Sequence, residues 1–562
     1  MGFRRGSILC AMRSRTTFAV LFSVAVLVTT AGLLAARQGT GRSTESTGTP
    51  EAKAFLAQAE ARMRGAPDYD AGIAFLKQAV QADPHFADAY ARLYSATQSA
   101  AIAKANQTEA KTGGAIDAAM NDLKKQYATW AAADPNNAIL AWAQGTLEEK
   151  DWAKAKAFYD RAVALDPYFA RTYLQLALIA DFSGDNQTQV ACLKRAADVA
   201  PADPQYFFYW ASAMKAIDPA RSIVLLQQVA DEYPGTERGA QGLYWAAFET
   251  RDLPTKIAIY ERLHRDFPPA KSGWSGSGMP ALLEAYERVD PKKALAFAQG
   301  LTTEMTEESD KKTWTEFAAY AQAVVSAQAS IDAGKGAEAV ALIGKAPRPR
   351  YIDTTPLDLL KASAQDASGA TAAAYDGLLV IASKTPTDAV NAAIATYGKK
   401  LGKRAAAIDA DLWAKLEANA KPAADFALPD YPGGKTVRLA DYRGKVVLVN
   451  FWYPSCGPCL GEFPTLQRVL TKYQDRGFVI LALNVYPDED EFVMPYMTNN
   501  HFTFRPLKTD TDWAEKNYAA RGYPTNALVD AAGRVIFKPG VVRGEQEQRT
   551  LELQVEMLLA HR

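Results

Sequence analysis

Six prolines recur through residues 84–268 at intervals of 51, 32, 34, 33 and 34 residues. Apolar residues stand eight and five positions before each proline, and two residues three apart share one face of an α-helix. A proline interrupts helical hydrogen bonding, so each one is expected to follow a helix end. This period is typical of stacked helix pairs. The prolines are Pro84, Pro135, Pro167, Pro201, Pro234 and Pro268, and the apolar pairs are Leu76/Ala79, Tyr127/Trp130, Tyr159/Ala162, Leu193/Ala196, Leu226/Val229 and Tyr260/Leu263.

One copy of this pattern, Ala155, Tyr159, Ala162 and Pro167, resembles the second helix of the tetratricopeptide repeat. Three of the prolines follow an aspartate, as is usual in that family, whereas the first-helix signature is poorly kept. The resemblance implies divergent repeats over residues 51–270, stacked into a superhelix whose concave surface binds a protein client. A generic α-helical bundle is the alternative.

The repeat fades between residues 271 and 420, where alanine-rich amphipathic segments persist at 282–289, 314–331 and 372–381. Glycine and serine at 272–278, and proline and arginine at 346–350, are expected to interrupt these helices. We expect degenerate helical repeats over residues 271–420.

A different texture begins near residue 421 and centres on a Cys-Gly-Pro-Cys motif. The apolar run 446–452 has the length and β-branched content of a strand buried on both faces. Apolar residues at helical spacing follow the motif, so Cys456 should lie where a strand gives way to a helix N-terminus. The unpaired N–H groups there favour a thiolate, which is the nucleophilic form of cysteine.

This arrangement predicts a thiol–disulfide exchange site. Cys456 should attack a substrate disulfide, and Cys459, one helical turn further on, should resolve the mixed disulfide. The two would form a redox-active disulfide between turnovers. Half of a zinc site is the alternative, but a structural zinc needs four ligands and no second Cys or His pair accompanies the motif. We therefore expect no metal and no cofactor.

Residues 421–562 resemble the thioredoxin fold, and more closely its extracytoplasmic TlpA/ResA branch. The resemblance rests on the strand-CGPC-helix unit, on Glu462 three residues after the second cysteine, and on Tyr523-Pro524-Thr525. It implies that Pro524 is cis and faces the cysteines, and that Glu462 takes part in catalysis. The substrate contacts that it implies are Trp452, Gly457, Pro458, Tyr523 and Pro524.

Three positions depart from the family pattern. Ser455 stands where many members have tryptophan, Asn450 where thioredoxins have a buried aspartate, and Ala482 where they have its lysine partner. The usual proton acceptor is therefore missing, and Glu462 is the expected replacement. The alternative is that Glu462 is an ordinary surface residue in the first turn of the helix.

The remaining pattern of this domain predicts an α/β order like that of the family. Asp488 should open a helix, and Asp512 should cap another. Strands are expected at 426–428, 437–439, 478–485, 525–530 and 534–538, and a closing amphipathic helix at 545–559.

Length and composition agree with a multidomain protein. At 562 residues the chain exceeds what one core usually supports, and 48% hydrophobic residues with zero formal net charge are typical of folded proteins. A pI near 6.9 provides no broad attraction to nucleic acid, so no nucleic-acid partner is expected.

The N-terminus predicts export. Residues 1–15 carry four arginines and should stay in the cytoplasm, whereas 16–36 are uncharged and long enough to cross about 30 Å of hydrocarbon. We expect an anchor in the inner membrane with the bulk of the chain in the periplasm. Cleavage of 16–36 as a signal is the alternative, because small residues flank it. Residues 37–50 are rich in Gly, Ser and Thr and predict a flexible linker.

The sequence thus predicts an α-helical tetratricopeptide-like solenoid followed by an α/β thioredoxin-fold domain, with an N-terminal anchor or signal. The expected function is extracytoplasmic thiol–disulfide oxidoreductase. Gly-Pro between the cysteines resembles reducing thioredoxins, with potentials of about −270 mV, and favours a reductase. Resemblance implies a membrane electron donor of the DsbD/CcdA type, with cytochrome c maturation or repair of oxidised envelope proteins as outlets.

Two other functions compete with this one. A non-enzymatic repeat scaffold would use the C-terminal domain only as surface. A thiol peroxidase would need threonine three residues before its reactive cysteine, where this chain has Tyr453.

Overall fold

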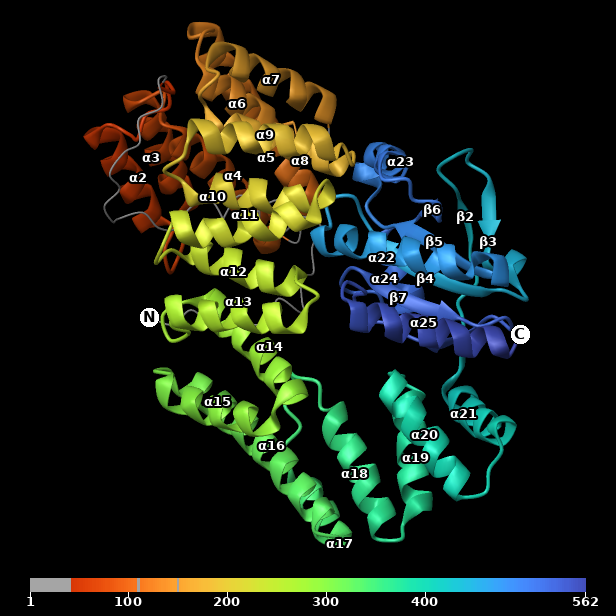
Figure 1. The fold of residues 1–562 in the computed structure, drawn as a ribbon. Helices are drawn as coiled ribbons and strands as arrows, with labels where there is room; N and C mark the ends of the chain where they lie inside the picture. The colour runs from red at the N-terminus through yellow and green to blue at the C-terminus, as the bar shows by residue number, and fades with distance from the viewer. Residues whose placement is uncertain (1–41, 109–111, 149–150) are drawn as a thin grey trace. The chain divides into compact units, whose positions relative to one another are not determined.

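The computed structural model describes residues 42–108, 112–148 and 151–562 (Figure 1). The chain divides between Pro219 and Ala220 into two compact units. In the first unit, helices adjacent in sequence pack against one another, as do α2 with α3 and α8 with α9. Its elements are α2 (Pro50–Arg62), α3 (Tyr69–Ala82), α4 (Ala87–Thr108), α5 (Thr112–Ala133), α6 (Ala138–Thr146), α7 (Trp152–Leu165), α8 (Ala170–Phe182), α9 (Asn186–Val199), α10 (Pro204–Ala213) and the short 3-10 helix η1 (Met214–Ala216).

The second unit begins with eleven further helices and ends with the mixed α/β domain. Packing of each helix on its neighbour in sequence continues from α12 to α20. These helices are α11 (Pro219–Glu232), α12 (Glu237–Glu249), α13 (Leu253–Asp266), α14 (Gly273–Val289), α15 (Pro291–Glu304), α16 (Glu308–Asp332), α17 (Gly336–Lys345), α18 (Thr355–Ala367), α19 (Thr371–Ala382), α20 (Asp388–Lys400) and α21 (Ala405–Asn419).

The observed helices confirm the helix ends that were predicted from the proline period. Helices α3, α5, α7, α9, α11 and α13 each end two residues before one of the six prolines. The predicted apolar pairs are buried, except that Trp130 is half-buried and stacks on Tyr127 with ring centroids 5.5 Å apart.

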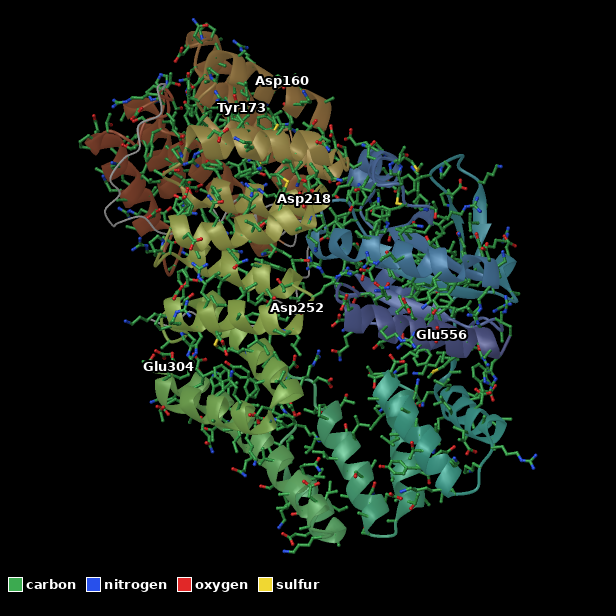
Figure 2. All side chains as sticks on the ribbon, viewed as in Figure 1. Asp160, Tyr173, Asp218, Asp252, Glu304 and Glu556 are labelled. Atoms are coloured by element: carbon green, nitrogen blue, oxygen red, sulfur yellow. A yellow bond between two sulfur atoms is a disulfide. The ribbon has the colours of Figure 1, made fainter. Side chains whose placement is uncertain are left out.

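A second signal with the same period marks the helix starts. Asp68, Asp151, Asp185 and Asp252 each stand sixteen residues before a proline and cap α3, α7, α9 and α13. Each side chain accepts a hydrogen bond from a backbone N–H of the first turn, which satisfies one otherwise unpaired donor. Figure 2 labels Asp252, whose carboxylate accepts from Thr255 N at 3.0 Å.

The linker prediction is wrong for residues 42–49, and residues 37–41 lie outside the described part of the chain. Ser43 Oγ and Thr44 N both donate to Asp166 Oδ2 at 2.6 Å, and Ser46 Oγ donates to Asp83 Oδ2 at 2.6 Å. The two aspartates close α7 and α3 and are buried, so they need donors there. The hydroxyls that suggested a flexible linker supply them.

One predicted interruption is present and the other is absent. The chain leaves helical conformation after Lys345, as residues 346–350 suggested. Residues 273–278, by contrast, belong to α14, whose start is capped by Ser272. Gly278 serves packing, since a Cβ there would stand 2.9 Å from Leu263 of α13.

The C-terminal domain is built on a six-stranded sheet in the order β1-β8-β7-β4-β5-β6. Strand β4 pairs in parallel with β5 and antiparallel with β7, so it lies in the middle of the sheet. The strands are β1 (Lys421–Pro422), β4 (Val446–Trp452), β5 (Phe478–Asn484), β6 (Arg505–Lys508), β7 (Thr525–Val529) and β8 (Arg534–Phe537), beside a separate hairpin of β2 (Ala427–Pro429) and β3 (Thr436–Arg438).

Helices cover β4 on both faces, and every residue of β4 is buried as predicted. Trp452 and Asn450 contact α22 (Gly457–Tyr473), whereas Phe451, on the opposite face, contacts Trp513 of α24 (Thr511–Tyr518). Helix α25 (Glu545–Ala560) packs against α22. Alternation along one strand therefore decides which side chains reach the cysteine helix.

Two local predictions in this domain need correction. Asp510, not Asp512, caps α24, because its carboxylate accepts from Trp513 N at 2.8 Å. Asp488 does not open an α-helix, because it lies in the 3-10 turn η4 (Pro487–Glu489). Helix α23 (Asp490–Asn499) begins only after this turn. Strands β1 and β6 were not predicted.

The predicted membrane segment 16–36 lies outside the described residues. Within 42–108, 112–148 and 151–562, no helix is both long and apolar enough to cross a bilayer.

Candidate active site

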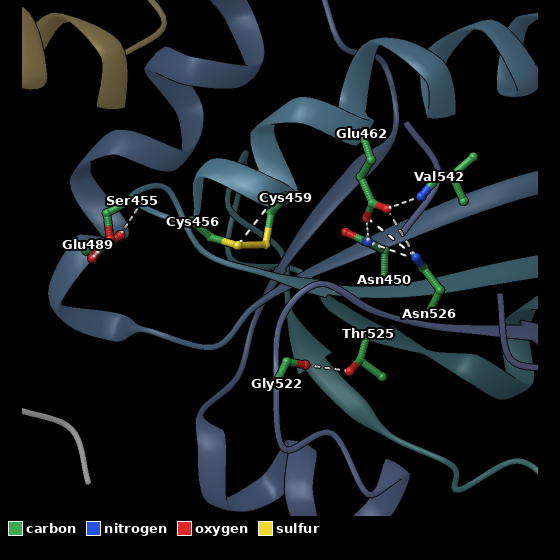
Figure 3. The surroundings of a disulfide bond; sticks show 10 residues. All are labelled: Asn450, Ser455, Cys456, Cys459, Glu462, Glu489, Gly522, Thr525, Asn526 and Val542. Carbon is green, nitrogen blue, oxygen red and sulfur yellow. Dashed lines mark hydrogen bonds between the residues drawn. A yellow bond between two sulfur atoms is a disulfide. The ribbon is translucent and has the colours of Figure 1, made fainter. Parts of the chain in front are cut away.

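The two motif cysteines form a disulfide at the start of α22 (Figure 3). Cys456 is the N-cap residue, and its Sγ accepts a hydrogen bond from Cys459 N at 3.3 Å. A sulfur at this position faces the unpaired N–H groups and positive end of the helix, which favour its thiolate once the disulfide is reduced. Cys456 is 2% exposed and Cys459 is fully buried, so a partner can approach Cys456 more easily.

Glu462 lies inside the protein, one turn beyond Cys459, and is fully buried. Its carboxylate accepts hydrogen bonds from Asn450 Nδ2 at 2.7 Å, from Val542 N at 3.0 Å and from Asn526 Nδ2 at 3.3 Å. The alternative of an ordinary surface glutamate is therefore wrong. Figure 3 shows the carboxylate turned toward these three donors.

Burial raises the pKa of Glu462 to about 7, from an ordinary value of 4.5. The three hydrogen bonds and the positive charge of Arg543 act in the opposite direction, because they favour the ionised form. The group can thus hold or release a proton near neutral pH, which is the requirement for a general acid or base.

The amides around Glu462 leave one acceptor unused. Asn450 Nδ2 donates both to Glu462 and to Asn526 Oδ1, at 2.7 and 2.9 Å, while Asn450 Oδ1 is buried and has no hydrogen-bond partner among the described residues. The amide thus turns its N–H donor, and not this oxygen, toward the carboxylate (Figure 3). The observed arrangement therefore favours the ionised form of Glu462.

A second, half-buried carboxylate fixes the residue before the nucleophile. Glu489 accepts from Ser455 N at 2.8 Å and from Ser455 Oγ at 2.5 Å (Figure 3). Burial raises the pKa of Glu489 above its ordinary value. Because Ser455 directly precedes Cys456, this pair restrains the turn that presents the sulfur.

The predicted substrate contacts divide into two groups. Gly457 and Pro458 are exposed, Tyr523 and Pro524 are half-buried, and the Tyr523-Pro524 bond is cis as the resemblance implied. Trp452, by contrast, is fully buried and packs on Phe463 and Tyr496, so the prediction of a substrate contact is wrong for it.

Three residues of this site were not predicted: Asn526, Glu489 and Arg543. Asn526 pairs directly opposite Asn450 in the β4–β7 register. Its position after the Pro-Thr dipeptide was the available signal, but only the strand register shows which residue it faces. Glu489 lay within the acidic run that was interpreted as a helix start.

Two parts of the chain match known protein families. Residues 418–552 match the family model described as Redoxin, and residues 170–203, which span α8 and α9, match the tetratricopeptide repeat.

Several relatives are similar over the C-terminal domain. The thiol-disulfide oxidoreductase ResA of Bacillus thuringiensis is 32% identical over 133 residues, which are 24% of this chain and 73% of that protein. The thioredoxin-like protein YneN of Bacillus subtilis is 30% identical over 131 residues, 23% of this chain and 75% of that protein. A crystal structure of the thioredoxin domain of a Bacteroides vulgatus thiol-disulfide oxidoreductase is 28% identical, with a TM-score of 0.22, and covers 24% of this chain and 96% of that one.

Proposed function

We propose a direction, a location and a class of client for this chain, which belongs to the ResA/TlpA-like family of thiol–disulfide oxidoreductases. It acts as an extracytoplasmic reductase of protein disulfides, tethered to the membrane by residues 16–36, and its helical repeats hold the client. The observation that carries the chemistry is the Cys456–Cys459 disulfide at the N-terminus of α22, with the buried carboxyl group of Glu462 one turn further on.

The reaction begins with the reduced dithiol. The Cys456 thiolate attacks one sulfur of the client disulfide, that S–S bond breaks, and the departing client sulfur takes up a proton. Cys459 then loses its proton and attacks Cys456 Sγ, which releases the second client thiol. Two electrons pass to the client, and the enzyme is left with the disulfide seen in the structure. A membrane dithiol donor of the DsbD/CcdA type restores the reduced form.

Glu462 accepts the proton that Cys459 must lose. Its hydrogen-bond partners among the described residues are Asn450, Asn526 and Val542, so the proton reaches it through one bridging water or a side-chain rotation. Because its pKa lies near 7, it is partly ionised at neutral pH and can accept this proton.

The repeats contribute binding rather than chemistry. One helix pair, α8 with α9, matches the tetratricopeptide model, and the helices of the first unit pack on their neighbours in sequence. Repeat arrays of this kind offer an extended surface to a partner. Holding a client on the same chain as the dithiol raises the effective concentration of its disulfide at Cys456.

A trapping experiment tests this proposal. Cys459→Ser retains the attacking sulfur but cannot resolve the mixed disulfide, so the reduced full-length variant should accumulate one covalent adduct per chain with a disulfide-bonded protein. Cys456→Ser and the double variant are the controls and should form none. Diagonal electrophoresis with mass spectrometry would identify the sulfur involved. An adduct on Cys459 in the Cys456→Ser protein, equal in yield to that of Cys459→Ser, would refute the assignment of roles.

A further inference from the structure

The loop between β8 and α25 carries both backbone groups that complete the Glu462 site. Val542 N donates to Glu462 at 3.0 Å, and Gly540 O accepts from Asn526 Nδ2 at 3.3 Å. The position of this loop therefore determines how well the carboxylate is solvated by hydrogen bonds. A contact that fixes the loop backbone therefore also fixes these hydrogen bonds of the Glu462 site.

Residues of α12 and α14, and of the turn after α12, contact this loop and the start of α25. The guanidinium of Arg543 lies over the ring of Trp245 in α12, 5.8 Å from its centroid. Arg251, just after α12, pairs with Glu545 at 3.2 Å, and Arg288 of α14 donates to Gln546 at 2.7 Å. The latter two contacts are exposed and contribute little alone. Together with the cation–π contact they fix the backbone next to Val542.

Arg543 also presses against the cysteine helix. A Cβ built on Gly461 would stand 2.6 Å from both Nε and Nη2 of Arg543. Only glycine at position 461 therefore allows the guanidinium to lie against α22, directly before Glu462. Arg543 Nε is buried and has no hydrogen-bond partner among the described residues, and the guanidinium lies close to both Trp245 and Gly461.

We infer that Arg543 is a positioning residue of the redox site, through which Trp245 of the helical region controls the proton acceptor Glu462. This inference rests on the proposed role of Glu462. It adds that the helices beside the catalytic domain tune its chemistry as well as supplying a surface for clients. The ring of Trp245 in the helical region holds the Arg543 guanidinium against α22 of the catalytic domain.

The charges around Glu462 set the direction of the effect. Asn450 from β4, Asn526 from β7 and the loop backbone are neutral, Cys456 and Cys459 lie on its own helix, and Arg543 brings a positive charge. That charge opposes the effect of burial on the pKa of Glu462. Without it, less carboxylate is present at a given pH, and the step that needs a base moves to higher pH.

The test uses the full-length reduced protein and measures the rate of the resolving step against pH. Arg543→Met, which keeps the aliphatic stem, should move the midpoint upward by about 1 pH unit. Gly461→Ala should move it in the same direction, because the new methyl group displaces the guanidinium while favouring the helix. Trp245→Ala should do likewise, and Trp245→Phe should restore the wild-type profile. Arg549→Met, whose arginine pairs with Asp388, is the control for loss of a nearby charge and should change nothing.

The outcomes separate this inference from the proposed function. If Glu462→Gln removes the pH dependence but Arg543→Met and Gly461→Ala leave it unchanged, the inference is overturned and the role of Glu462 stands. If Glu462→Gln leaves the profile unchanged as well, both fail. A shift for Arg543→Met that Trp245→Ala does not reproduce would overturn the part assigned to the helical region.

Discussion

Replacing Glu462 by glutamine should make the stability of the C-terminal domain less dependent on pH. The pKa of Glu462 is about 7 in the folded protein and 4.5 as its ordinary value, so between these two pH values the folded state keeps a proton that the unfolded chain has released. The contribution of this group to the free energy of unfolding is therefore largest below pH 4.5 and falls as pH rises toward 7. At about 1.4 kcal/mol per pKa unit, the wild type should lose about 3 kcal/mol that the glutamine variant does not.

Glutamine also brings an amide N–H toward the donors Asn450, Asn526 and Val542. This costs hydrogen bonds, but the cost does not vary with pH over this range. The informative quantity is thus how the difference in free energy of unfolding between the two proteins changes with pH, not the size of that difference at one pH.

Urea unfolding of the oxidised full-length protein from pH 4 to pH 8, followed by pulse proteolysis, would measure this slope. Peptides from β4 and α22 report the C-terminal domain separately from the helical repeats. Glu515→Gln, on the exposed face of α24, is the matched control for loss of a carboxyl group. A stability difference between wild type and Glu462→Gln that stays constant across this range would refute the reasoning.

Two further predictions concern direction and location. Equilibration of the Cys456–Cys459 disulfide with a dithiol buffer should give a reduction potential near the thioredoxin value of about −270 mV, whereas a potential near −120 mV would indicate an oxidase. The mature protein should keep residues 16–36 and sediment with membranes, which intact-mass measurement of the N-terminal peptide checks. A chain that starts just after Ala36 would instead show cleavage of a signal.

Local signals predicted the parts of the site that belong to one stretch of chain. The run 446–452 is strand β4, and the helix after the motif begins at Gly457, because strand length, proline and apolar spacing act within a few residues. Local signals do not predict a helix start when two neighbouring residues could each provide the cap. Asp510 and Asp512 are both suitable caps, and only the observed hydrogen bond to Trp513 N distinguishes them.

Pairing between distant segments could not be predicted in this way. Asn450 and Asn526 face each other because β4 and β7 are neighbours in one register, and a slip of one residue would point either side chain to the other face. The same limit applies to Ser455 and Glu489, whose hydrogen bonds join the motif to the turn after β5. The residue pattern of each segment does not indicate which distant segment it contacts.

The burial of Glu462, by contrast, is accessible from helical spacing. Cys459, Phe463 and Leu466 define the apolar face of α22, and Glu462 lies three residues after the first of them, on that same face. A charged side chain there must either interrupt the core or find donors within it. The position of one carboxylate on an apolar helix face thus argues by itself for a buried ionisable group. Its donors require the fold, because they come from two strands and a loop that meet only in the assembled sheet.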